Sequence, residues 1–242
     1  MTSSVIDIPL LNLSFLLLLI VPVLYMQYRW NLDTKKSLYA LVRMLLQLFS
    51  IGFVLAFIFQ ADNVFIVLGV LTIMLLAATW ISLNPLKSPA RPLYIAAFAG
   101  VLVSSFFSLT VITQGLLRVD PWYSPRMLIP LGGMTFLGGV TAISLSAERM
   151  ISELGQGVSY EKARIAAFNT ALIPVINSLF AVGLASLPGM MTGQILAGTS
   201  PLIAVKYQIA IMVMSFSSAG IATSVFLALG KKHFVPASKS RT

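Results

Sequence analysis

The sequence predicts an all-α polytopic membrane protein, a bundle of about seven transmembrane helices. Of its 242 residues, 58% are hydrophobic and 10% are charged, far below the roughly 25% of charged residues in soluble domains. Its mean hydropathy is +0.94. The apolar residues form runs about 20 long, enough for a helix to cross a hydrocarbon core of about 30 Å. The runs lack the period-two alternation of barrel strands, and helices satisfy their own backbone polar groups in lipid.

Charged residues and Pro or Gly breaks divide the chain into seven apolar runs. The expected spans are residues 9–28, 38–59, 63–83, 93–116, 127–146, 166–187 and 202–229. The first run has no basic residue before it and is long for the core of a signal peptide, so we interpret it as a retained span. We expect residues 1–242 to form a single transmembrane domain.

The basic residues predict how the chain crosses the membrane. With the N-terminus outside, all of the 16 Lys and Arg residues except Arg118, Arg126 and Lys206 fall in inner segments. This positive-inside bias puts the C-terminus in the cytoplasm. We expect the chain to be a multi-pass protein of the cell inner (plasma) membrane. The net charge of +9 is thereby explained by topology, so we expect no nucleic-acid partner. The absence of cysteine excludes disulfides and thiolate metal sites.

No internal energy source is predicted. A carried proton needs an ionisable group within the membrane, yet every acidic residue falls in an expected loop or at a span end. These residues are Asp7, Asp33, Asp62, Asp120, Glu148, Glu153 and Glu161. The chain has no G-x-x-x-x-G-K-[ST] phosphate loop and no H-E-x-x-H, G-x-S-x-G or carboxylate-pair signature. We therefore predict no catalytic residue, no cofactor and no enzyme activity, and any transport would draw energy from a partner.

The longest inner segment, about residues 147–165, is the expected place for such a partner. Its first part, residues 148–154, predicts a short helix with Met150, Ile151 and Leu154 on one side. The more exposed positions are Glu148, Arg149 and Glu153, and Gly155 and Gly157 end the helix before Ser159 begins the next one. An amphipathic helix of this kind suits a cleft on a cytosolic subunit, and the alternative is a solvated linker.

Two stretches resemble a known family. "RMLLQLFSIGFVL" (residues 43–55) is similar to the second span of FetB-type ABC transporter permeases, the UPF0014 family. "ALIPVINSLFAVGLASLPGMMTGQILAGTSPLIAVKYQI" (residues 171–209) resembles that family's most distinctive block, in order and spacing. The resemblance implies a permease subunit that works as two copies with a separate cytosolic ATP-binding cassette subunit. The family is linked to bacterial iron export, and its plant relatives to aluminium tolerance and UDP-glucose transport.

The same resemblance gives residues 153–157 the part of the coupling helix that enters the ATPase cleft. Two rival functions remain. One is an ATPase-independent secondary transporter or channel, which internal symmetry between the halves would support. The other is a membrane scaffold or assembly factor, which an absence of solute flux would support.

Polar residues within the apolar runs are the candidates for a path or gate. Arg43 and Gln47 are four residues apart and share a helix face, where they would hold an inner gate, or Arg43 would only reach the interface. Pro174 frees a backbone carbonyl in the sixth run, and Asn177 is the deepest polar residue there. Such groups either line a path or join helices.

Residues 188–201 are about 14 long, too short to cross the membrane, so we expect a re-entrant or interfacial turn that closes the outer mouth. Its candidate gate residues are Pro188, Gly189, Met190, Met191 and Gln194. Adjacent methionines on a helix point about 100° apart, and thioethers suit Cu(I) better than iron or aluminium. We therefore favour a hydrophobic plug at Met190 and Met191 over a metal site.

Overall fold

The computed structural model describes residues 8–59, 63–86 and 89–234. The α-helices are α1 (Leu17–Arg29), α2 (Thr34–Ile58), α3 (Val64–Ser82), α4 (Arg91–Thr110), α5 (Pro125–Gly155), α6 (Tyr160–Ala181), α7 (Gly189–Leu196) and α8 (Pro201–Phe234). A 3-10 helix, η1 (Leu10–Leu16), precedes α1, and a π-helical turn, η2 (Val111–Leu116), follows α4. Within these described ranges there is no strand, and seven helices are long and apolar enough to cross a membrane. The predicted all-α bundle with seven spans is confirmed.

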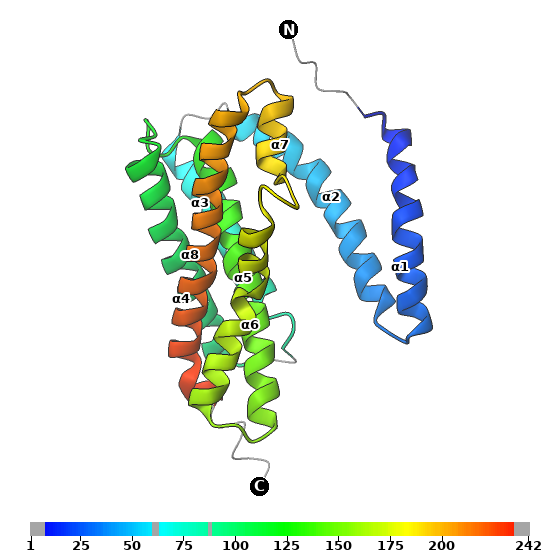
Figure 1. The fold of residues 1–242 in the computed structure, drawn as a ribbon, viewed down its shortest axis with the longest axis vertical. Coiled ribbons are helices and arrows are strands. Elements are labelled where there is room, and N and C mark those ends of the chain that lie inside the picture. The colour runs from blue at the N-terminus through cyan, green and yellow to red at the C-terminus, as the bar shows by residue number, and fades with distance from the viewer. Residues whose placement is uncertain (1–7, 60–62, 87–88, 235–242) are drawn as a thin grey trace. The chain divides into compact units, whose positions relative to one another are not determined.

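The helices group into two compact units. The first holds α1 and α2, which form a hairpin whose second helix is capped by the Asp33 carboxylate, accepting a hydrogen bond from the Lys36 N–H at 3.0 Å. In α1 no described side chain is buried, and in α2 Ile58 alone is. The second unit holds α3 to α6, most of α7, and α8 (Figure 1). The candidate groove lies within this second unit.

Small residues allow the helices of the second unit to pack closely. A Cβ atom added to Gly100 on α4 would lie 2.7 Å from the backbone oxygen of Ala222 on α8. Two helical turns further along α4, the buried Ser108 and Ser218 join the same two helices through their hydroxyls at 3.2 Å. On α5, a Cβ atom at Gly139 would meet the Ala222 methyl at 3.4 Å. Such contacts are how helices associate in lipid, where no hydrophobic effect drives them together.

The boundaries of α5 and α6 differ from those predicted. The expected separate helix over 148–154 is the end of α5, which runs without a break from Pro125 to Gly155. The helix continues because Ala147 and Met150 are fully buried against the bundle, so the charged residues between them only occupy its exposed face. Ile151, expected beside Met150, is 47% exposed. Gly157, at φ +81° in the left-handed region, ends the turn after α5.

The sixth span is displaced towards the N-terminus relative to the expected residues 166–187. Ser159 is its N-cap, as predicted, and α6 begins at Tyr160 because Tyr160, Ala163 and Ala167 form a buried stripe. The helix ends at Ala181, before Gly183, whose φ of +84° reverses the chain. The segment expected over 188–201 contains the eight-residue helix α7, which is too short to cross the membrane.

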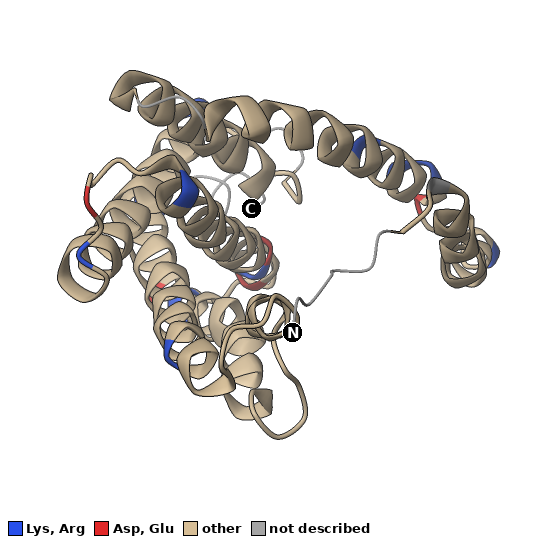
Figure 2. Ribbon diagram, turned by 90° about the horizontal axis from the view of Figure 1, so that it is seen from above, with Lys and Arg blue, Asp and Glu red and all other residues tan. Residues whose placement is uncertain are grey.

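Charged residues are sparse along the helices (Figure 2). In the second unit, one end of the bundle is formed by the start of α4 and α6 and the end of α5 and α8. The basic residues described at this end are Arg91, Arg149, Lys162, Arg164, Lys231 and Lys232, and those towards the other end are Arg118, Arg126 and Lys206. We call the first the basic end, and it is the end that the sequence predicts to face the cytoplasm.

Candidate solute groove

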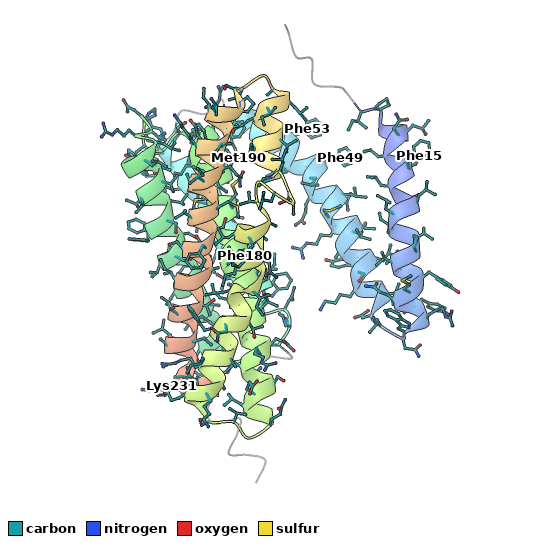
Figure 3. All side chains as sticks on the ribbon, viewed as in Figure 1. Phe15, Phe49, Phe53, Phe180, Met190 and Lys231 are labelled. Carbon is teal, nitrogen blue, oxygen red and sulfur yellow. The ribbon has the colours of Figure 1, made fainter. Side chains whose placement is uncertain are left out.

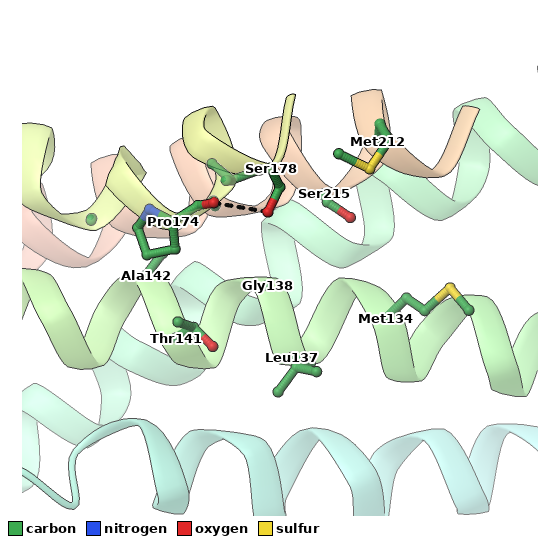
Figure 4. Close-up of a pocket in the computed structure, with 12 residues that line it drawn as sticks. Met134, Leu137, Gly138, Thr141, Ala142, Pro174, Ser178, Met212 and Ser215 are labelled. Atoms are coloured by element: carbon green, nitrogen blue, oxygen red, sulfur yellow. Dashed lines mark hydrogen bonds between the residues drawn. The ribbon is translucent and has the colours of Figure 1, made fainter. Parts of the chain in front are cut away.

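A groove of about 300 Å³ opens between α5, α6 and α8 (Figure 4). It is lined by one face of each helix, so the three helices run alongside each other for its whole length. Every residue that lines it is uncharged. We call it the central groove.

The central groove carries polar groups in an otherwise apolar wall. Thr141 lies on α5, Ser178 on α6 and Ser215 on α8. The Ser178 hydroxyl donates to the Pro174 carbonyl at 2.9 Å, which leaves its own oxygen as an acceptor. The groove therefore offers hydroxyl groups from all three helices to a solute, without a fixed charge.

Pro174 also lines the groove and lies inside α6. Because proline has no N–H, the carbonyl of Thr170 lacks its usual helical donor. Proline is one of the few causes of a sharp bend within a helix. The wall that α6 contributes can therefore change shape at this point.

Packed alanines close one end of the central groove, on the side of the basic end. Ala142, Ala171 and Ala219 come from the three helices, are at most 4% exposed and form one cluster with Leu172. Since alanine has a single methyl group, a small separation of the helices would remove this closure. We call these three residues the alanine closure.

A second apolar cluster lies towards the other end, with Leu131, Ala210 and Met214 among its buried members. Met134, which lines the central groove, packs against this cluster, and so does Met190 from α7 (Figure 3). The structure thus brings Met190 to the same cluster as the groove wall. This agrees with apolar packing by the thioether, and the role of a plug stays a prediction.

The other gate candidates on this segment lie as follows. Met191 is half-buried, Gly189 is exposed and Pro188 is half-buried. The side-chain oxygen of Gln194 is buried with no hydrogen-bond partner in the described part of the chain, and the same is true of Gln208 on α8. The side-chain oxygens of Gln194 and Gln208 are therefore buried acceptors to which no group in the described part of the chain donates a hydrogen bond.

Not every predicted path residue lines the groove. Asn177 is exposed and lies one position before Ser178, so its side chain points about 100° away from the groove-lining face. Thr141 and Ser215 line the groove, and sequence reasoning missed them. A signal existed in the small and polar residues at helical spacing on α5, Gly138 and Thr141, which share one face.

Arg43 and Gln47 lie on α2, in the first unit. Their spacing places them on one face of that helix, as predicted. Arg43 is half-buried and Gln47 is exposed. Their role as an inner gate stays a prediction.

The predicted coupling segment lies at the basic end of the second unit. Arg149 pairs with Glu153, one helical turn away on α5, and both precede Gly155. Glu148 and Gly155 are exposed, whereas the Glu153 side chain is 14% exposed and thus more buried than predicted. Its ion-pair partner Arg149 is the more exposed of the two, at 47%.

Contacts between α6 and α8 hold the start of α6 in place at the same end. The Tyr160 hydroxyl donates to the Leu227 carbonyl, and Glu161 pairs with Lys231 at 3.0 Å. The Lys231 ammonium also lies 5.2 Å from the centre of the Tyr160 ring, within range of a cation–π interaction. The α5–α6 loop is therefore attached to α8 as well as to its own helices.

Comparison with known proteins assigns the chain to a family. The profile of UPF0014, described as an uncharacterised protein family, matches residues 10–235. The chain belongs to UPF0014. A UPF0014 membrane protein of Synechocystis sp. is 37% identical over 196 residues, which is 75% of this chain and 76% of the relative.

Two further UPF0014 relatives carry informative names. The "Probable iron export permease protein FetB" of Escherichia coli is 30% identical over 239 residues, covering 92% of this chain and 91% of the relative. The "Protein ALUMINUM SENSITIVE 3" of Arabidopsis thaliana is 31% identical over 220 residues, covering 84% and 79%. No solved structure matches the chain. The chain is thus a multi-pass UPF0014 membrane protein, and these relatives are named as a permease or by a metal sensitivity.

Proposed function

We propose that this UPF0014 protein is the membrane-spanning permease subunit of an ABC transporter that exports iron ions from the cytoplasm. A separate cytosolic ATP-binding cassette subunit would supply the energy, and two copies of the chain in the inner membrane would form the path. Residues 1–242 would act as one permease domain that has no ATPase site of its own. The similarity to an iron export permease along 92% of the chain is the observation that carries this proposal.

The path of α5 gives the proposal a physical route from the loop to the groove. The helix is continuous from Thr141 in the central groove to Gly155 beside the loop. These 14 residues span about 21 Å at the 1.5 Å rise of an α-helix. The loop also leads directly into α6, which lines the groove at Pro174 and Ser178. A force applied near Glu153 by an ATPase would therefore reach two walls of the groove through rigid elements.

In this mechanism, ATP binding closes the ATPase subunits and pushes the segment from Glu148 to Gly157. The alanine closure then separates, and the hydroxyl groups of the central groove replace part of the solute's hydration. Met190 and Met191 form the outer plug, while Arg43 and Gln47 hold the inner gate. Differential binding of the two conformations to the ATPase drives the change.

Reconstitution tests the proposal. The chain is co-expressed with the ATP-binding cassette subunits of its own genome, and we expect one of them to co-purify and to hydrolyse ATP faster in its presence. In inside-out proteoliposomes, ATP should drive iron into the lumen. If none of the subunits associates with the chain and none hydrolyses ATP faster in its presence, the ABC assignment is refuted. Flux that is equal without ATP would indicate a secondary transporter or channel, and flux of UDP-glucose in place of iron would indicate a nucleotide-sugar exporter.

A further inference from the structure

A second groove, of about 250 Å³, lies between α6 and α8 near the basic end of the bundle. It shares no lining residue with the central groove. Its lining residues are Arg164, Ile165, Phe168 and Asn169 on α6 and Ser224, Leu227 and Ala228 on α8. We call it the lateral groove.

The mouth of the lateral groove is positively charged. Arg164 pairs with one carboxylate oxygen of Glu161 at 3.0 Å, and Lys231 pairs with the other oxygen at 3.0 Å. One carboxylate therefore serves two cations, so the cluster keeps one positive charge. About half of the Arg164 and Lys231 side-chain surface stays exposed, at 48% and 54%, and can meet an additional anion.

The walls below this mouth are apolar. Ile165 is 61% exposed and Phe168 half-buried on α6, while Leu227 forms the buried floor at 1% exposure. Ala228 is small and exposed and leaves the space open. A surface of this kind matches a hydrocarbon chain that lies along the two helices.

Two polar side chains interrupt the apolar walls. Asn169 and Ser224 are exposed and make no hydrogen bond with any residue in the described ranges. Asn169 is five residues beyond Arg164, and thus about 7.5 Å deeper along the helix axis. An amide left without a partner in an apolar medium costs about 1–3 kcal/mol. A ligand with an acceptor below its anionic group would satisfy both side chains.

We propose that the lateral groove binds an anionic phospholipid. The phosphate lies at Arg164 and Lys231, the ester carbonyls accept hydrogen bonds from Asn169 and Ser224, and an acyl chain covers Phe168. Basic pockets between transmembrane helices at the cytoplasmic side are suited to such headgroups. The inference needs only that the chain lies in a membrane, and it does not depend on an ATPase or on the solute.

The test measures lipid binding to the purified, delipidated full-length chain. Phosphatidylglycerol and phosphatidylcholine with identical acyl chains are compared by native mass spectrometry and by the thermal unfolding midpoint. We expect phosphatidylglycerol to bind more tightly and to raise the midpoint further. Equal binding of the two lipids would overturn the proposal.

Charge variants give effects of opposite sign. R164Q leaves Glu161 and Lys231 as a neutral pair. We expect the affinity for phosphatidylglycerol to fall about fivefold, because that factor corresponds to the binding free energy that one basic residue contributes near an anionic membrane surface. E161Q removes the shared carboxylate, so the affinity should rise by a similar factor. R149Q is the matched control, because Arg149 is as exposed as Arg164 but lies on α5 outside the lateral groove. A loss in R149Q equal to that in R164Q would show attraction to general surface charge only and refute the site.

A second copy of the chain is the other occupant to exclude. The chain has no cysteine, so A228C introduces a single thiol in the lateral groove. We expect A228C to be labelled by a membrane-soluble maleimide and to be protected by phosphatidylglycerol. If A228C forms disulfide-linked dimers whether or not this lipid is present, the occupant of the lateral groove is a second copy of the chain and the lipid proposal is wrong.

Discussion

The contact between Gly100 and Ala222 gives a prediction whose size follows from the structure. In G100A the new Cβ atom would lie 2.7 Å from the Ala222 backbone oxygen, whereas ordinary contact begins at 3.4 Å. Neither partner is the end of a flexible side chain, so α4 and α8 must move apart. Overpacking of this kind costs about 1–3 kcal/mol.

The control is G220A, on α8, where an added Cβ atom meets nothing within 4 Å. Both variants replace a helical glycine by alanine, so each gains the same helix propensity of about 1 kcal/mol. The difference between them isolates the steric cost. For a chain of this size 1 kcal/mol corresponds to about 2–4 °C, so G100A should unfold roughly 2–12 °C below G220A.

The assay is thermal unfolding of both variants in the same detergent and at the same scan rate, followed by tryptophan fluorescence. A fixed scan rate matters because membrane proteins often unfold irreversibly. G220A should unfold at or slightly above the midpoint of the original protein. Coincident midpoints for G100A and G220A would refute the close approach of α4 and α8.

Three further predictions concern the groove and its supports. G138L places a side chain in the central groove, and its Cβ atom would make ordinary contacts with the Ser218 Cβ at 3.6 Å and the Ser215 backbone oxygen at 3.7 Å. Transport should therefore be lost while the unfolding midpoint stays unchanged. G220L is the control and should keep its flux. P174A restores a helical N–H in α6, so the midpoint should stay equal or rise while flux falls; full flux would contradict a bend at this point. Y160F removes the hydroxyl that donates to Leu227, which should cost about 1 kcal/mol and lower the midpoint by a few degrees; an unchanged midpoint would contradict that bond.

The spans were predictable because the bilayer imposes a length on each apolar run. The ends of α5 and α6 were not, because a helix can leave the membrane while one of its faces stays packed. Met150 is fully buried nine residues beyond Thr141, yet the charged Glu148 and Arg149 directly precede it. Hydropathy averages over all sides of a helix, so it cannot detect a buried stripe beside an exposed one.

The groove was less predictable than the spans for the same reason. Polarity alone favoured Asn177, but a rotation of 100° separates it from the groove-lining Ser178. The spacing of Gly138 and Thr141 marks one face of α5, but the sequence does not show that this face meets Ser215, and only the packing of α5 against α8 places Thr141 and Ser215 at one groove. The short segment around Met190 was predictable because Pro188 and Gly189 break the apolar pattern.

The supports of α6 suggest where a force on the loop would act. From Tyr160 to Glu161 the helix is held to α8 by the Leu227 and Lys231 contacts. Pro174 lies 14 residues further on, just beyond Ala171 of the alanine closure. Because the first half of α6 is tied to α8, we expect it to move with α8 and a bend at Pro174 to take up the difference from the second half. We therefore expect the helix to yield next to the alanine closure, while the fully buried Ala147, Ala167 and Phe226 still separate that closure from the basic end.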